Sequence, residues 1–215
     1  MIPKYVLASI AVSVGGLLNG YDAGGIGAIT VMPEFEKTFG KLSPSVVNFA
    51  ISLTMLARAF PATCVGHLID RTGRLRAMII GGVMFGISAT IHGTAMTLAQ
   101  FLVGRALSRL GEGLYVSNVS VYIAEIAPVK SRGVLACLPQ FIATAVVCVG
   151  YFTAYGSVEI PSSMVQHLPY VVQVSLTFAL VGSCLPLPDS PGWLISYGKR
   201  AESIHALERP YFSLV

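Results

Sequence analysis

The chain has 215 residues, of which 54% are hydrophobic and only 11% are charged. A soluble globular domain carries about 25% charged residues, so this composition excludes an ordinary soluble protein and indicates an integral membrane protein. The formal net charge of +4 is small, and no basic stripe interleaved with aromatic residues accompanies it. The sequence therefore gives no sign of a nucleic-acid partner.

Six apolar stretches are long enough to cross a bilayer, which takes about 20 residues in a helix. The first is longer than the apolar region of a secretory signal and has no clear cleavage site, so we interpret it as a span. The sequence thus predicts an all-α integral membrane fold, a bundle of six transmembrane helices. Their approximate ranges are residues 5–30, 46–66, 77–95, 98–123, 134–156 and 168–188.

The placement of Lys and Arg predicts the orientation of these spans, because basic residues accumulate in cytosolic loops. With the amino terminus in the cytosol, the outer loops hold only Lys37 and Lys41. The cytosolic segments then hold Lys4, Arg71, Arg74, Arg76, Lys130, Arg132, Lys199, Arg200 and Arg209. We therefore expect both termini to be cytosolic.

The connections between the spans are too short for a soluble catalytic domain, and no P-loop, HExxH or GxSxG motif occurs. The glycines near residues 24–27 lack the spacing of a dinucleotide site. The cysteines show no metal-ligand spacing either; they are Cys64, Cys137, Cys148 and Cys184. We expect no enzymatic activity, no catalytic residue, no metal and no cofactor.

An aspartate, Asp22, lies in the apolar stretch "NGYDAGGIG" of the first span, where an ionised carboxylate is costly without a partner. It lies about eight residues, or ~12 Å, from the outer end of its span. Arg105 lies about seven residues, or ~10 Å, from the outer end of the fourth span. Because the two depths agree, we predict an Asp22–Arg105 pair, either functional or purely structural.

Three more ionisable residues fall inside predicted spans. Arg109 and Glu112 are three residues apart on one helix and can meet, and Glu112 is expected to neutralise the neighbouring arginines. Arg58 lies in the middle of the second span with no acid nearby in the sequence. A mid-membrane arginine costs roughly 2.5–3.5 kcal/mol on insertion scales, so it needs an acid on another span unless the chain tolerates the defect.

The segment "GHLIDRTGRLR", residues 66–76, joins the second and third spans on the predicted cytosolic side. Gly66 and Gly73 suit close backbone approach or a tight turn. Asp70 can accept hydrogen bonds from a helix amino terminus, and Arg71 and Arg74 can donate to carboxylates or lipid phosphates. On composition alone, the segment also fits an ordinary positive cytosolic loop.

Its pattern resembles the loop between helices two and three of the major facilitator superfamily. Four further motifs resemble the sugar porter family in its usual order and spacing, with "GYD" in the first span: "GRALSRLGEG" (104–113), "YIAEIAPVKSRG" (122–133), "LPQF" (138–141) and "LPDSPGWLISYGKRAE" (187–202). The stretches "GYDAGGIGAITVMPEFEKTF" and "GYFTAYGSVEIPSS" look most like fungal members. The resemblance implies the amino-terminal six-helix half of a twelve-helix fold, without its carboxy-terminal half.

The resemblance also implies roles for individual residues. Asp22 corresponds to the acid that takes the coupling proton, and Arg105 to the arginine that tunes it. Gln140 corresponds to a glutamine that contacts the sugar, although such an amide also suits bonding between helices. A cytosolic ion-pair network that latches the two halves together is implied for Asp70, Arg74, Glu125, Arg132 and Asp189.

The chain departs from the family pattern at several positions. Gly192 stands where the family usually has arginine, and "QHLP" (166–169) replaces the usual Trp-Arg before Pro. Arg109 and Arg58 stand where small or hydroxyl residues are common. These departures remove one expected latch partner and add two membrane charges.

The expected function is transmembrane transport of a sugar, polyol or related polar solute by alternating access, with proton symport. The expected partners are that solute, protons, the lipid bilayer and either a second half-transporter or a second copy of the chain. The plasma membrane is the expected location. The alternative is a truncated half that does not transport alone, or a sensing or binding partner, because alternating access needs two halves that rock around a midplane site.

Overall fold

The structure, a computed structural model, describes residues 3–29, 44–157 and 168–198. Helices and their short connections make up this part of the chain, and no strand occurs within it. The helices are α1 (Lys4–Val12), α2 (Val14–Ile29), α4 (Pro44–Thr72), α5 (Arg74–Gly93), α6 (Leu98–Ile126), α7 (Arg132–Ser157), α8 (Leu168–Cys184) and α9 (Pro191–Ser196).

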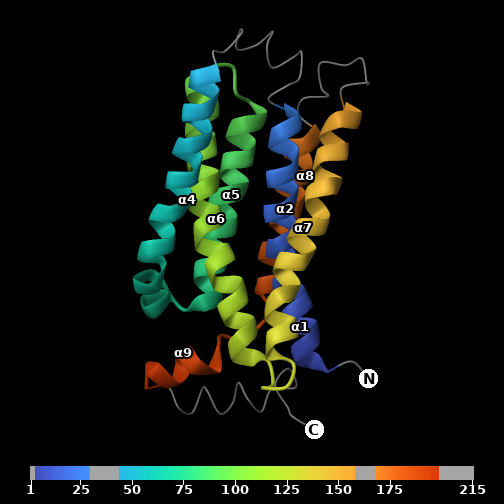
Figure 1. The fold of residues 1–215 in the computed structure, drawn as a ribbon. Helices are drawn as coiled ribbons and strands as arrows, with labels where there is room; N and C mark the ends of the chain where they lie inside the picture. The colour runs from blue at the N-terminus through green and yellow to red at the C-terminus, as the bar shows by residue number, and fades with distance from the viewer. Residues whose placement is uncertain (1–2, 30–43, 158–167, 199–215) are drawn as a thin grey trace.

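The helices form two groups (Figure 1). In one group α4 and α5 pack against α6, and in the other α2 packs against α7 and α8. The groups meet where α5 packs against α8 and where α6 packs against α7. The short helix α9 lies at the end where α1 begins and α4 passes into α5 (Figure 1), and we call this the α9 end of the bundle.

The predicted first span is divided into α1 and α2 at Ser13. The hydroxyl of Ser13 donates a hydrogen bond of 2.6 Å to the carbonyl of Ser9. The amide of Gly16 donates one of 2.8 Å to the carbonyl of Ser13. Serine bonds of this kind to the preceding turn bend helices. The path is therefore continuous but locally distorted, which the hydropathy pattern did not predict.

Glycines allow the closest helix contacts. Gly16, Gly20 and Gly24 are spaced four residues apart, so they share one face of α2. A Cβ atom on any of them would overlap a backbone carbonyl oxygen of α7, that of Pro139, Ala143 or Val147. Small residues at such positions let backbones approach, which is how transmembrane helices gain packing energy.

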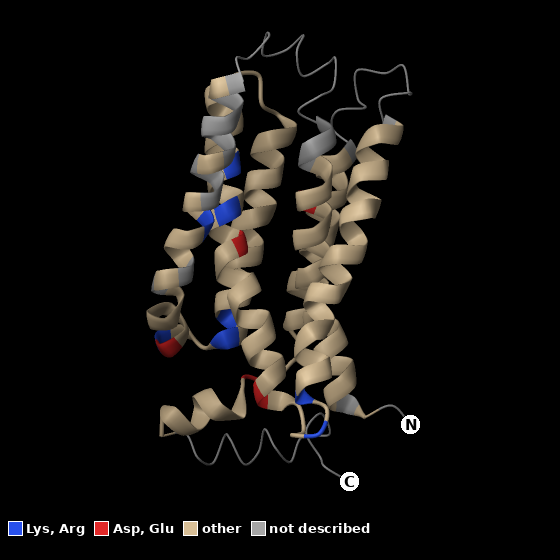
Figure 2. Cartoon of the chain, viewed as in Figure 1, with Lys and Arg blue, Asp and Glu red and all other residues tan. Residues whose placement is uncertain are grey.

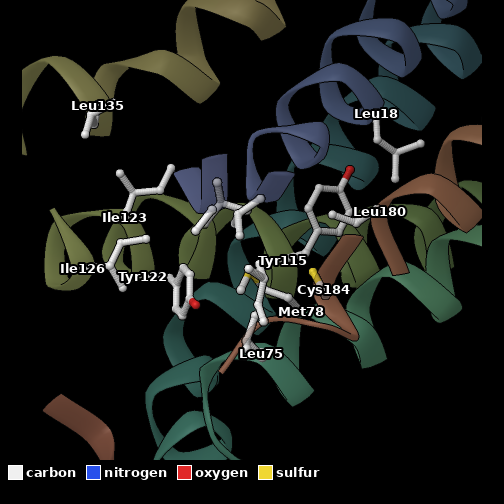
Figure 3. Close-up of a cluster of buried hydrophobic side chains, with 14 of the residues drawn as sticks. Leu18, Leu75, Met78, Tyr115, Tyr122, Ile123, Ile126, Leu135, Leu180 and Cys184 are labelled. Carbon is white, nitrogen blue, oxygen red and sulfur yellow. The ribbon is translucent and has the colours of Figure 1, made fainter. Parts of the chain in front are cut away.

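The main apolar core lies toward the α9 end and joins α1, α2, α5, α6, α7 and α8. Figure 3 shows Tyr115 and Tyr122 of α6 among aliphatic side chains from the neighbouring helices. Both tyrosines are fully buried, and the hydroxyl of Tyr122 donates to the carbonyl of Pro188 at 2.8 Å. The buried members include Leu18, Leu75, Met78, Ile123, Leu135, Leu180 and Cys184.

Three stretches of the described residues have the length and hydropathy of a membrane span: Tyr5–Gly25, Arg74–Gly93 and Arg132–Gly156. Pro169–Cys184 is apolar but shorter. The ends of the helices differ from the predicted spans: α4 continues to Thr72, so the expected loop 67–76 narrows to Gly73, the residue before α5. The short helix α9 was not predicted.

Candidate functional site

Asp22 of α2 is completely buried and has three partners on other helices. Its Oδ1 atom lies 3.0 Å from Nη1 of Arg105 and accepts a hydrogen bond of 3.0 Å from Nε2 of Gln173. Its Oδ2 atom lies 3.0 Å from Nη2 of Arg109. The expected Asp22–Arg105 contact is therefore present, and Arg109 and Gln173 complete a shell from α6 and α8.

A second carboxylate continues this arrangement. Arg109 also pairs with Glu112 on its own helix, as the sequence predicted, through Nη1 and Oε2. The other oxygen of Glu112, Oε1, lies 3.3 Å from Nη1 of Arg58 on α4. We call these five residues, Arg105, Asp22, Arg109, Glu112 and Arg58, the buried charge chain.

The buried charge chain connects α2, α4 and α6 partway along their lengths. Figure 2 shows basic and acidic segments of the helices away from the helix ends. The side chain of Glu112 is fully buried, and those of Arg105 and Arg109 are nearly so. The side chain of Arg58 is 38% exposed, so Arg58 on α4 is the member of the buried charge chain that reaches the surface.

The sequence of α6 explains this geometry. Arg105, Arg109 and Glu112 are separated by four and then three residues, which places them on one helix face. Gly113 lets α4 approach that face, because a Cβ there would lie 2.8 Å from the carbonyl oxygen of Arg58. The arginine on α4 is thereby brought within reach of Glu112.

His92 of α5 is a buried titratable residue that no sequence motif indicated. The residue is 4% exposed, and its ring packs against the rings of Phe101 and Tyr170, with centroids 5.3 and 5.6 Å away. It is near enough to Asp22 and Arg105 to sense their charges. A single histidine in an apolar helix was the only available signal.

Gln140 of α7 lies apart from the buried charge chain. Gln140 is exposed, and within the described residues no side-chain hydrogen bond links it to the buried charge chain. It borders a shallow hollow between α2, α6 and α7. Asn19 and Ser120 also line this hollow, so polar groups from three helices meet there.

At the α9 end, Arg74 and Glu125, two of the five residues of the implied network, form an ion pair. The pair is bidentate, with Nε to Oε2 at 2.8 Å and Nη2 to Oε1 at 2.5 Å. The hydroxyl of Ser190 also donates to Oε2 of Glu125, which connects the segment before α9 to α6. This geometry links the ends of α5 and α6 to the entry of α9.

Other residues of the expected cytosolic network have different surroundings. Gly73 has a φ of +92°, as a tight turn requires, and a Cβ there would lie 3.2 Å from Oδ1 of Asp189. Asp70 is exposed, and its carbonyl, rather than its carboxylate, accepts a 3.1 Å hydrogen bond from Trp193. Asp189, not Asp70, is thus the acid at the start of α5.

The remaining positions do not match their expected packing. Gly66 lies inside α4 with open space around its missing Cβ, so neither close approach nor a turn accounts for a glycine there. Arg71 and Arg132 are exposed, and among the described residues neither takes part in the Arg74–Glu125 pair. No three His, Cys, Asp or Glu side chains of the described residues gather as a metal site would need.

The substitution Gly192→Arg is expected to stabilise the α9 end of the bundle. A Cβ at Gly192 would lie 3.5 Å from Cδ of Glu125, so an arginine side chain starts beside that carboxylate. Because Glu125 is partly exposed, Gly192→Arg is expected to add about 0.5–1 kcal/mol to the free energy of unfolding. Hydrogen exchange of the α9 amides measures the effect, with Gly192→Met as the uncharged control of similar helix propensity. Equal protection in both variants would contradict the predicted ion pair.

These contacts define what the site can do chemically. A buried carboxylate between two arginines and an amide can hold or release a proton, and either change alters the attraction between α2 and α6. The family model for sugar (and other) transporters matches residues 8–211 of the chain. The chain belongs to the sugar (and other) transporter family. With its apolar helices, this transporter-family chain is an integral membrane protein.

Individual relatives agree with this assignment. The transporter-family chain is 32% identical over 212 residues to the arabinose-proton symporter of Bacillus subtilis, a match that covers 95% of the chain and 44% of that protein. It is 31% identical over 205 residues to monosaccharide-sensing protein 2 of Arabidopsis thaliana, covering 95% of the chain and 28% of that protein. The chain thus spans less than half the length of these relatives.

The fold matches solved structures of the major facilitator superfamily. The structure of the proton:xylose symporter XylE bound to 6-bromo-6-deoxy-D-glucose superposes with a TM-score of 0.84 at 23% identity, over 97% of this chain and 50% of that one. A partially occluded inward-open XylE from E. coli superposes with a TM-score of 0.81 at 24% identity, over 95% and 55%. The fold is therefore one six-helix half of the superfamily architecture.

Proposed function

We propose that the chain forms the amino-terminal half of a transporter that moves a monosaccharide or polyol by alternating access, coupled to protons. The observation that carries the proposal is the buried Asp22, bound by Arg105, Arg109 and Gln173 from two other helices. In this proposal Asp22 takes the coupling proton and Arg105 tunes its affinity. One relative, from Bacillus subtilis, is an arabinose-proton symporter, and one superposed structure is that of a proton:xylose symporter, which supports the proposal.

The electrostatics of Asp22 connect proton binding to helix movement. When ionised, the carboxylate attracts both arginines across a low-dielectric interior, where ion pairs are stronger than in water. When protonated, it keeps hydrogen bonds but loses the charge that attracts α6 and α2 to each other. Uptake of one proton therefore weakens the α2–α6 contact, which is the kind of bias that alternating access needs.

The rest of the proposal follows the positions of the polar groups. Gln140 and the hollow it borders face the solute, because an amide offers both donors and acceptors to a polyol. The Arg74–Glu125 pair belongs to the gate at the α9 end, which we place in the cytosol with both termini. The proposed location is the plasma membrane, and the carboxy-terminal half or a second copy supplies the opposite wall of the pathway.

A sensing role is the second candidate. The relative monosaccharide-sensing protein 2 matches this chain over 95% of its length. A half-transporter that binds solute and proton without a complete pathway would report their concentrations rather than carry them. The two candidates differ in uptake and agree in solute binding.

Uptake of radiolabelled glucose, xylose and arabinose in cells expressing the 215-residue chain tests the proposal. We expect uptake to rise as the external pH falls, and we expect Asp22→Asn to remove this pH dependence because the amide cannot exchange the proton. Asp70→Asn, an exposed acid at the α9 end, is the matched control and should keep it. Uptake no higher than with empty vector would reject transport by this chain, and an unchanged pH dependence in Asp22→Asn would reject the proton site.

A further inference from the structure

The buried charge chain is not electrically neutral. It holds three arginines, Arg58, Arg105 and Arg109, against two carboxylates, Asp22 and Glu112. His92, the other titratable side chain that senses these charges from α5, adds no negative charge. Among the residues that the structure describes, one positive charge is therefore left over inside the membrane, where an unbalanced ion is strongly disfavoured.

The unbalanced charge is concentrated at Arg58. Arg105 and Arg109 are buried and held by Asp22 or Glu112 at 3.0 Å or less. Arg58 forms one ion pair among the described residues, at 3.3 Å to Glu112, a carboxylate that also pairs with Arg109. A guanidinium has five N–H donors, so most of those of Arg58 are available at its 38% exposed face.

The depth of Arg58 restricts what can neutralise it. It occupies the middle of α4, which runs from Pro44 to Thr72, so each helix end is about 20 Å away at 1.5 Å per residue. Lipid phosphates lie at the bilayer surfaces, out of reach of a side chain at that depth. A counter-ion other than a lipid phosphate therefore has to reach Arg58 at its 38% exposed face.

We infer that this chain binds a sugar acid, a polyhydroxylated solute with one carboxylate, and that Arg58 receives that carboxylate. The inference rests on the proposed function and specifies its substrate class. The planar fork of an arginine matches a carboxylate in bidentate geometry, and a single excess charge matches a monoanion better than a phosphate dianion. A neutral sugar would leave the excess charge in place.

Proton binding and sugar-acid binding are linked in this arrangement. Asp22 faces Arg105 and Arg109 from α6, Gln173 from α8 and His92 from α5. Two tyrosines also interact electrostatically with it, Tyr115 from α6 and Tyr170 from α8. Beyond its first residue, α7 contributes no Asp, Glu, Lys, Arg or His to this contact. When Asp22 takes its proton, the excess rises to two positive charges, so a sugar acid binds more tightly at lower pH, whereas a neutral sugar gains no such charge term.

The test compares galacturonate with galactose, which share a ring and differ by a carboxylate at one carbon. The purified 215-residue chain in phosphatidylcholine nanodiscs is titrated with each solute by equilibrium dialysis at pH 6. We expect galacturonate to bind about tenfold more tightly than galactose. In Arg58→Gln the ratio should fall to about one, and in Arg76→Gln, an exposed arginine outside the charge chain, it should stay unchanged.

The outcomes separate the inference from the proposed function. Equal affinities for galacturonate and galactose in the unaltered chain would overturn the sugar-acid inference. A galacturonate preference that survives Arg58→Gln would overturn it as well. In either case, binding of galactose would leave the proposed function standing. Binding of neither solute would count against both. A second arm joins the chain to the carboxy-terminal half of the Bacillus subtilis arabinose-proton symporter. If the galacturonate preference disappears there, a side-chain carboxylate from that half fills the site and the inference is wrong.

Discussion

Asp22→Ala is expected to lower the free energy of unfolding by about 3–5 kcal/mol, the usual cost of removing one partner from a buried ion pair. The alanine would leave Arg105 without its 3.0 Å partner and Arg109 with Glu112 alone. It would also remove the acceptor of the Gln173 amide. Reversible unfolding of the purified chain in mixed micelles measures the loss.

The control for this variant is Asp70→Ala. Asp70 is exposed at the α9 end, and the replacement of an exposed charge typically changes stability by less than 1 kcal/mol. The difference in unfolding free energy between the two variants therefore measures the effect of burial, because both variants lose a carboxylate. A loss below 1 kcal/mol for Asp22→Ala would show that its three partners find compensation elsewhere, against the arrangement described above.

Gly20→Leu is expected to separate α2 from α7. A Cβ at Gly20 would overlap the carbonyl oxygen of Ala143 and lie 2.9 Å from its Cα atom. These are backbone atoms, so no side chain can rotate away and the helices must move apart. Overpacking of a core costs typically 1–3 kcal/mol, and we expect at least about 3 kcal/mol here because two backbones are displaced. The unfolding midpoint and the folded fraction after purification report the effect.

Gly66→Ala and Gly182→Ala are the matched controls. Both glycines lie in helices with open space around the missing Cβ. Alanine favours a helix over glycine by roughly 0.5–1 kcal/mol, so both controls should be neutral or slightly stabilising. If Gly20→Leu behaved as these controls do, the close α2–α7 contact would not exist in the protein.

The sequence predicted contacts of charged side chains inside the membrane, where an unpaired charge is costly. An acid and an arginine at equal depth in separate spans led to the Asp22–Arg105 pair, and the spacing of Arg109 and Glu112 led to the second. For Arg58 the sequence left two alternatives, an acid on another span or a tolerated defect, and it did not identify Glu112 as the partner. Depth follows from counting residues along a helix, whereas the partner depends on how each helix is rotated about its axis, which depends on packing.

Neutral and short features were harder to predict. Gln173 carries no charge, so its hydrogen bond to Asp22 left no mark in hydropathy or charge placement. The distortion at Ser13 and the short helix α9 depend on single hydrogen bonds and on contacts with other helices. Gly66 is the opposite case, a prediction from a motif that the packing does not explain. It lies within a recognisable motif, but no neighbouring atom would contact a Cβ at this position.

The buried charge chain also constrains the order in which the protein is assembled. Asp22 emerges from the ribosome 83 residues before its partner Arg105. The helix α6 is not among the stretches apolar enough to enter a bilayer on hydropathy alone, because it carries two arginines and Glu112. Entry of α6 is favourable when α2 and α4 are already in place to receive those charges. The helices α2 and α4 therefore act as an internal insertion template, and changes at Asp22 would alter the yield of membrane-integrated protein before they alter any later step.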